Sequence, residues 1–290
     1  ASKGRNSSSL MGAVYEFLTL VSANVGVMII DAWVNIFPEA FAQRWAAKDE
    51  QRGVVQMFGP DLAKGPTVES LLAGHVDVAW NTPLAHARVK RRTGGASLSL
   101  GMRDSDRDFR AKVVVRKDAG IRTLADLAGK TLAVGSRDST QARILPLHFL
   151  AQEQVDLARV RLLPFDTDLG KHGDTGTSEL DVLAALRDGR AHAGAVGDLV
   201  WVNEQAAGRV DPSRLEVLYT TPGFDHCMFD ALASFPRAQG DAFWRALAAM
   251  RWDDPPSRRL LELEGLRQWM PPREEGYASL VAALDATSGW

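Results

Sequence analysis

The sequence feature that most constrains the fold is the stretch TLAVGSRDSTQAR, residues 131–143. It opens with a short apolar run ending at Gly135, which is typical of a buried strand. A hydroxyl-rich turn follows, and apolar residues then recur at helical spacing (Ile144, Leu147, Leu150). Ser139 or Thr140 is a suitable N-cap, because a hydroxyl there accepts a hydrogen bond from an orphan helix N–H. The stretch therefore predicts a strand, a turn and the start of a helix.

The turn and helix start supply four candidate ligand residues: Ser136, Ser139, Thr140 and Gln141. N–H groups point outward at a helix N-terminus, the helix dipole is positive there, and hydroxyls add neutral donors. This combination favours an anion site. The alternative is an ordinary N-cap in an α/β unit, and the segment alone leaves both interpretations open.

Composition excludes several functional classes. The 290 residues are 46% hydrophobic and 24% charged with a net charge of −2, so nothing favours a nucleic-acid partner. One cysteine, Cys227, excludes an intrachain disulfide and a cysteine-based zinc site. The most apolar window, 17–30, is too short for a membrane span, which needs roughly 20 residues. No signal peptide is recognisable, and residues 1–9 are expected to be a disordered or artificial tail.

Strands alternate with helices along the chain, which predicts α/β layers with parallel strands. The pattern turns helical from Asp241 to the end, with breaks at Pro255-Pro256 and Pro271-Pro272. The expected strands are 10–14, 54–58, 76–80, 113–116, 131–135, 160–163, 191–196 and 215–219. Two segments repeat the same order of helix end, glycine stop, short link and strand: residues 71–79 and 186–194. One copy on each side of the central stretch indicates two similar lobes.

Several segments together resemble the substrate-binding proteins of phosphate, phosphite and phosphonate ABC transporters. LADLAGK (124–130) followed by TLAVGSRDST resembles the segment that introduces the anion loop in those proteins. The other matching segments are LLAGHVDVAWNTPLAH (71–86), GKHGDTGTSELDVLAALRDGRAHAGAV (170–196), DHCMF (225–229) and DDPPSRRLLELEGLRQW (253–269). The resemblance extends from about Gly53 to the end and is weaker before it.

The resemblance implies a two-lobed type II periplasmic-binding-protein fold, each lobe a mixed, mostly parallel sheet flanked by helices, with the ligand cleft between them. Chain crossings are expected near 108–112 and 220–226. Lobe one would then comprise 10–109 and 226–290, and lobe two 110–225.

Further site residues follow from strand ends, where open α/β sheets bind ligands, or from the resemblance. Tyr15, Asn81 and Thr82 are expected in lobe one, although a capping turn before Pro83 is an alternative for the last two. Asp198 ends a lobe-two strand and would suit a ligand amine or hydroxyl, or else lies in solvent. His172 sits in a glycine-rich charged loop, and His226 at a crossing would contact ligand or the other lobe. The histidines lack i, i+4 ligand spacing, so no metal is expected.

The function implied is a solute-binding protein of an ABC importer, which closes two lobes over a small anionic or zwitterionic solute and delivers it to a membrane permease. No reaction and no cofactor are expected. We expect a monomer in the periplasm or another extracytoplasmic compartment. The alternatives are an enzyme on the same fold, such as a pyrimidine-precursor synthase, and a stand-alone ligand sensor.

Overall fold

The computed structural model describes residues 30–31, 67–168 and 177–287. Its contacts divide the chain into two compact units. Unit 1 extends up to Arg107 and resumes over Cys227–Arg273, and unit 2 comprises Asp108–His226 and the segment from Glu274. The expected division instead placed 226–290 entirely in lobe one. The predicted strands at 10–14 and 54–58 lie outside the described residues.

Unit 1 is built on a five-stranded sheet with strand order β1-β2-β9-β3-β10. Its strands are β1 (Ile30–Asp31), β2 (Val78–Asn81), β3 (Leu98–Arg103), β9 (Met228–Ala231) and β10 (Trp269–Met270). Strands β1 and β2 are parallel, whereas β9 is antiparallel to both β2 and β3, and β10 is antiparallel to β3. Thus β1, β2 and β3 share one direction, and the sheet is mixed.

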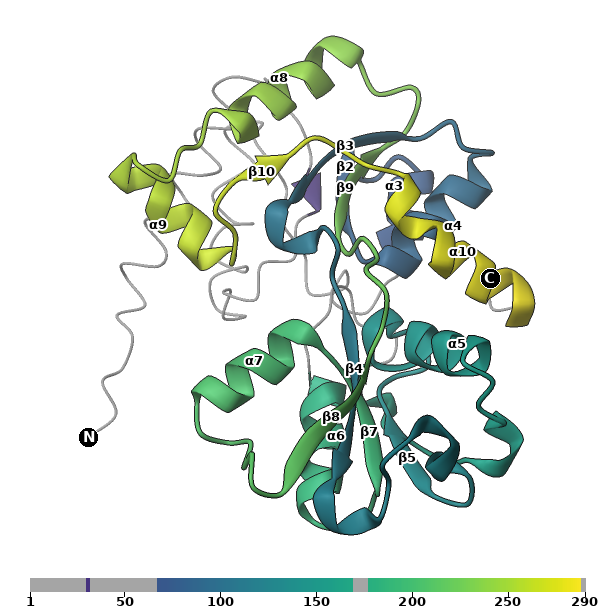
Figure 1. Ribbon diagram of the computed structural model, residues 1–290. Helices are drawn as coiled ribbons and strands as arrows, with labels where there is room; N and C mark the ends of the chain where they lie inside the picture. Colours follow the sequence, from purple (N-terminus) through teal and green to yellow (C-terminus); the bar gives the residue numbers. More distant parts are fainter. Residues whose placement is uncertain (1–29, 32–66, 169–176, 288–290) are drawn as a thin grey trace. The chain divides into compact units, whose positions relative to one another are not determined.

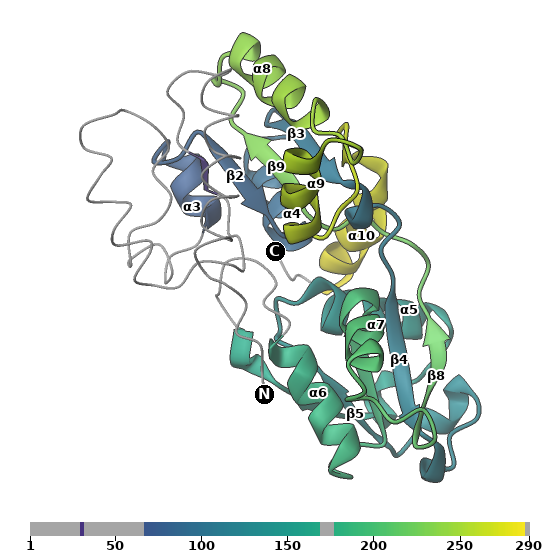
Figure 2. The same cartoon turned by 90° about the vertical axis from the view of Figure 1, so that its left-hand side faces the viewer.

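The helices of unit 1 pack on that sheet through alternate side chains, as successive strand residues face opposite sides. Val78 and Trp80 of β2 belong to a core with residues of α8 (Arg237–Ala248) and α9 (Pro255–Leu263), including Phe243 and Leu261. Ala79, between them, packs instead with α3 (Thr67–Leu72) and α4 (Pro83–Arg92). Figures 1 and 2 show these helices around β2, β3 and β9.

The helical pattern expected from Asp241 to the end, with breaks at the two proline pairs, is present as α8, α9 and α10 (Ala278–Thr287), but it missed a strand. Helix α8 already starts at Arg237, and the two-residue strand β10 interrupts the helical segment by pairing with β3, Trp269 opposite Arg103. Strands β3 and β9 were also not expected. Burial of all four β9 residues removes the alternating pattern that marks a half-exposed strand.

Unit 2 contains a second five-stranded sheet, with order β6-β5-β7-β4-β8. Its strands are β4 (Ala111–Arg116), β5 (Thr131–Val134), β6 (Arg161–Pro164), β7 (Ala193–Gly197) and β8 (Leu215–Thr220). Strands β5, β6 and β7 are parallel, and β4 is antiparallel to β7 and β8. Four strands therefore share one direction, and the mixed, mostly parallel sheet expected from the resemblance is present.

Both faces of this sheet are covered by helices (Figure 1). Val114 and Ala133 pack with α6 (Thr177–Arg187) and with Trp201 of α7 (Asp198–Ala206). The neighbouring Val113 and Leu132 face the opposite core, which contains Leu150 of α5 (Leu145–Gln152). The last helix, α10 (Ala278–Thr287), contacts α5.

The repeated segments form the same local structure, one in each unit. Helix α3 leads to Gly74 at φ +72° and then to β2, and α6 leads to Gly189 at φ +76° and then to β7. A left-handed residue ends a helix by satisfying its last carbonyls, and only glycine adopts it without steric cost. The two glycines thus stop the helices and return the chain to the sheet.

Candidate functional site

The stretch 131–143 forms the predicted strand, turn and helix in unit 2. Strand β5 ends at Val134, and a π-helical turn, Thr140–Ile144, opens the helix that continues as α5. Ser139 is the N-cap: its Oγ accepts the N–H of Ala142 at 3.2 Å. π-helical turns are rare in proteins, and those that are present often lie at functional sites. Of the two caps predicted, Ser139 is confirmed.

Hydrogen bonds hold the turn after β5 against the segment that follows β6. Ser136 is fully buried and its hydroxyl donates to the Phe165 carbonyl at 3.1 Å, while the Arg137 N–H donates to Asp166 at 2.9 Å. A Cβ on Gly135 would lie 2.6 Å from that of Ala142, closer than two carbons approach. Glycine is therefore required for the turn to pack against its own helix.

Thr140 differs from its neighbours because its side chain is unsatisfied. The residue is 2% exposed, and among the described residues its Oγ1 has no hydrogen-bond partner. A buried hydroxyl without a partner costs free energy, so native proteins rarely keep one without a reason. Because it lies at the first turn of a helix, this hydroxyl adds a donor to N–H groups that have no intrahelical partner.

Gln141 joins the helix start to two other segments of unit 2. Its Nε2 donates to Glu179 Oε2 at 3.1 Å, and its Oε1 lies 3.4 Å from His226 Nε2. A carboxylate only accepts, so the amide nitrogen must face Glu179 and the amide oxygen His226. His226 is buried with its ring 4.6 Å from that of Phe109, and Tyr277 donates to its carbonyl at 2.9 Å. The structure thus brings Ser139, Thr140, Gln141 and His226 together.

Glu179 is the residue in this cluster that sequence analysis missed. It is 1% exposed, and besides Gln141 it accepts the N–H of Gly197. The expected helix began at Leu180, whereas α6 begins at Thr177. The sequence did indicate that Glu179 is buried, because it shares helical spacing with Val182, Leu183 and Leu186. A carboxylate on an apolar face points to a buried polar role.

Asp198 is not at a free strand end but is the first residue of α7. Its carboxylate forms an ion pair with Lys112 at 2.7 Å. An acidic residue in the first turn is also stabilised by the helix dipole. The carboxylate therefore already has a cation, and a ligand amine would have to compete with Lys112.

In unit 1, Asn81 ends β2 and is fully buried. Its Nδ2 donates to Asp230 at 2.8 Å, and the same carboxylate contacts His86 Nδ1 at 2.9 Å and Ser99 Oγ at 3.3 Å. Thr82 is the N-cap of α4, with Oγ1 accepting the Ala85 N–H at 3.4 Å, and Pro83 is the first helical residue. Thr82 thus caps α4, which is the alternative that the sequence left open beside a contact with ligand.

The remaining candidates are accounted for as follows. Tyr15 and His172 lie outside the described residues. The segments 108–112 and 220–226, where crossings were expected, pair within unit 2: Phe224 N–H donates to the Phe109 carbonyl, and Thr221 N–H to that of Ala111. Cys227 is buried, as expected for a small apolar residue. No described helix is long and apolar enough to cross a membrane.

Two α/β units, each with a mixed five-stranded sheet and helices and each built from segments far apart in the sequence, are the architecture of type II periplasmic binding proteins. The sequence model of the family described as "ABC transporter, phosphonate, periplasmic substrate-binding protein" matches residues 65–277, well over half of the chain. The chain belongs to this family. It is therefore a solute-binding protein of an ABC transporter, with a small-molecule ligand and a permease partner, rather than an enzyme. The family implies an extracytoplasmic location.

Individual relatives agree with this assignment. The chain is 25% identical over 228 residues, 77% of its length and 71% of the relative's, to the probable ABC transporter phosphite binding protein PhnD1 of Prochlorococcus marinus. A structure of PhnD1 from this organism with methylphosphonate has a TM-score of 0.67 at 18% identity, covering 99% and 96% of the two chains. The aliphatic sulphonate binding protein SsuA of Escherichia coli has a TM-score of 0.51 at 17% identity, covering 89% and 82%. These two similarities show the fold.

Proposed function

We propose that the protein captures a small phosphonate- or phosphate-like oxyanion, and that the loop 136–141 provides the main contact. The observation that supports this most directly is the buried, unpartnered hydroxyl of Thr140 at the start of a helix. A tetrahedral oxyanion would accept from this hydroxyl and from the helix N–H groups, and so remove the penalty of the unmade hydrogen bond. The relatives named above bind phosphite, methylphosphonate and sulphonate, which share tetrahedral oxyanion chemistry.

The rest of the proposed site comprises Tyr15, Asn81, Thr82, His172, Asp198 and His226. The polar surroundings of two of them support this part of the proposal. His226 contacts Gln141 of the loop, and the side-chain nitrogen of Asn81 donates a hydrogen bond to Asp230. We further propose that two lobes close over the ligand, and that the protein is a periplasmic monomer.

Thr140→Val tests the loop. The change keeps the shape of the side chain and removes the hydroxyl, so the ligand-free protein should be as stable as the unaltered one or more stable. Calorimetric titration with methylphosphonate, phosphite and inorganic phosphate should show binding to the unaltered protein. We expect the affinity for the bound anion to fall about tenfold in the variant, since hydrogen bonds to charged groups contribute roughly 1.5–3 kcal/mol.

The matched control is Thr220→Val, at an exposed threonine that ends β8. It should bind as the unaltered protein does. Equal affinity of the Thr140→Val variant, with the fold verified by circular dichroism, would reject the loop as the anion contact. Small-angle scattering should show a smaller radius of gyration at saturating ligand, and light scattering a monomer mass. An unchanged profile with bound ligand would argue against closure.

A further inference from the structure

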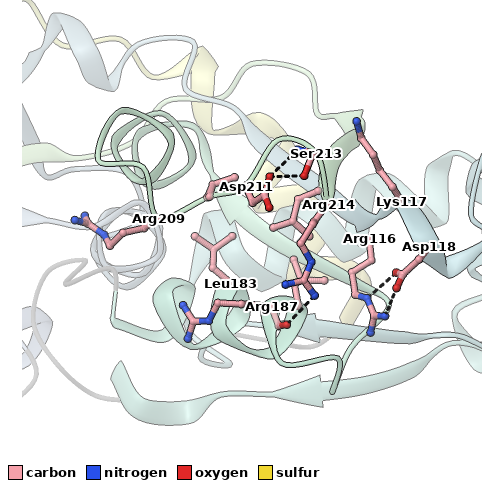
Figure 3. A pocket seen from close by; sticks show the side chains of 12 residues that line it. Arg116, Lys117, Asp118, Leu183, Arg187, Arg209, Asp211, Ser213 and Arg214 are labelled. Carbon is pink, nitrogen blue, oxygen red and sulfur yellow. Dashed lines mark hydrogen bonds and ion pairs between the residues drawn. The ribbon is translucent and has the colours of Figure 1, made fainter.

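Unit 2 contains a cavity of about 230 Å³ that none of the predicted site residues lines. It is formed by the end of β4, the C-terminal turn of α6, the segment after α7 and the start of β8 (Figure 3). Strand β4 pairs Ala111 with Gly197, beside Glu179, and ends at Arg116 on the cavity. Five residue steps of roughly 3.4 Å place the two ends of this strand about 17 Å apart. The cavity is therefore separate from the anion loop.

The cavity has an apolar floor. Leu183 and Leu186 come from α6, and Val210 and Leu215 from the segments on the other side, and all four side chains are buried. They belong to the core beneath the sheet, so their positions are set by packing rather than by loop conformation. A ligand with a small apolar body would find a preformed surface here.

The rim is cationic. Five basic side chains line the cavity, against two carboxylates: Arg116, Lys117, Arg187, Arg209 and Arg214, against Asp118 and Asp211. Two of the arginines are already neutralised by two-pronged ion pairs, Arg116 with Asp118 and Arg209 with Glu204. In each pair the guanidinium hydrogen bonds lower the pKa of the carboxyl below its usual value.

Lys117 and Arg214 are not neutralised in this way. Neither ammonium nor guanidinium forms an ion pair within 4 Å among the residues that the structure describes, and Arg214 reaches only the Arg187 carbonyl, at 3.5 Å. Asp211 is turned to Ser213, from which it accepts two hydrogen bonds at 2.9 and 2.6 Å. The Lys117 N–H donates to the Arg214 carbonyl at 2.9 Å, so the backbone holds the two cationic residues next to each other.

From this arrangement we infer that the cavity is a second ligand site, for a small organic anion with a short apolar body, such as an aryl carboxylate or aryl phosphate. The guanidinium of Arg214 presents a planar fork that matches carboxylate and phosphate oxygens. Lys117 lines the same rim and adds a second positive charge, with its side chain directed away from that of Arg214 (Figure 3). The leucine and valine floor takes the apolar part. The anion replaces solvent at two cations that form no ion pair within 4 Å in the described part of the chain, where the charge of Asp211 acts on both from farther away.

The test uses benzoate and phenyl phosphate as probes, with benzamide as the neutral analogue of benzoate. Binding to the whole chain is followed by NMR titration. Both anions should saturate, and benzamide should bind at least tenfold more weakly than benzoate. Lys117→Ala/Arg214→Ala should lose tenfold or more in affinity for both anions, whereas Arg122→Ala, at an exposed arginine of the same unit, should not.

Thr140→Val separates this site from the anion loop and should leave benzoate affinity unchanged. If the double variant does not fold, Arg214→Gln alone, at an exposed position, is expected to weaken both anions severalfold. The inference is overturned if neither anion saturates at millimolar concentration, if benzamide binds as well as benzoate, or if the affinities survive loss of Lys117 and Arg214. None of these outcomes bears on the Thr140 experiment, so the two proposals fail separately.

Discussion

The backbone N–H of Gly197 donates a hydrogen bond to Glu179 Oε1, with the two atoms 2.5 Å apart. The bond joins the last residue of β7 to the first turn of α6, and the other carboxylate oxygen accepts the amide of Gln141. A Cβ on Gly197 would lie 3.0 Å from Gln141 Cγ and 3.1 Å from that carboxylate oxygen. Glycine thus allows the strand end to approach both side chains, and Glu179 connects the sheet to the anion loop.

Glu179→Leu should destabilise the protein strongly. It leaves the Gly197 N–H and the Gln141 amide without this acceptor in a buried environment, at about 1–3 kcal/mol each. Urea unfolding should show a loss of at least about 2 kcal/mol. Glu179→Gln keeps one acceptor oxygen and should lose clearly less. Equal losses for the two variants would contradict the assigned role.

Ser139→Ala removes the N-cap of the helix that starts at Thr140. Loss of a hydroxyl cap costs about 1 kcal/mol of stability, within a range of 0.5–2. The expected result is a lower free energy of unfolding, measured without ligand, whereas Thr140→Val shows no loss. If Thr140→Val lowered the free energy of unfolding and Ser139→Ala did not, Thr140 rather than Ser139 would be the cap.

Gly276→Ala should strain the segment that precedes α10. A Cβ at this position would overlap the Asp225 carboxylate, which accepts the Asp108 N–H at 3.2 Å. Overpacking of this kind costs about 1–3 kcal/mol. Adding Asp225→Ala to Gly276→Ala removes the overlapping atoms, so a double-mutant cycle by thermal unfolding should show a positive coupling. Additive losses would mean that the alanine is accommodated elsewhere.

Asp230→Ala should be among the most destabilising single changes in unit 1. The carboxylate is fully buried and serves Asn81, His86 and Ser99 together. Removing one partner of a buried pair costs about 3–5 kcal/mol. The control is Asp253→Ala, which breaks an exposed pair with Arg251 and should leave the thermal midpoint unchanged. Similar midpoints for the two variants would refute the buried network.

Glu264 predicts a pH dependence of stability. Burial, opposed by the charge of Arg103, raises the pKa of Glu264 to about 7 from an ordinary 4.5. Between these values the folded state holds a proton that the unfolded state has released, so stability is present at low pH and falls as pH rises from about 4.5 to 7. Glu264→Gln should remove this part of the slope in urea unfolding at a series of pH values. An identical slope in the variant would assign the dependence to another group.

The sequence by itself determined the local parts of the fold and site. The order of strand, hydroxyl turn and helix at 131–143, the two glycine stops and the position of the cap depend on neighbouring residues, whose periodicity and conformational preferences are visible in the chain. These predictions are confirmed. The family was also recognisable, because its motifs are short and continuous.

Only the tertiary structure decided the contacts between distant segments. The pairing of β9 with β2 and β3, the acceptor role of Glu179 and the compensation of Asp198 by Lys112 join residues 18 to more than 100 positions apart. So does the hydrogen bond from Tyr277 to His226, which ties the C-terminal segment to unit 2. Such contacts follow from how layers pack and which buried polar groups must be satisfied. The periodicity of the sequence does not predict these contacts, because an unpaired buried group costs free energy only once the core has formed.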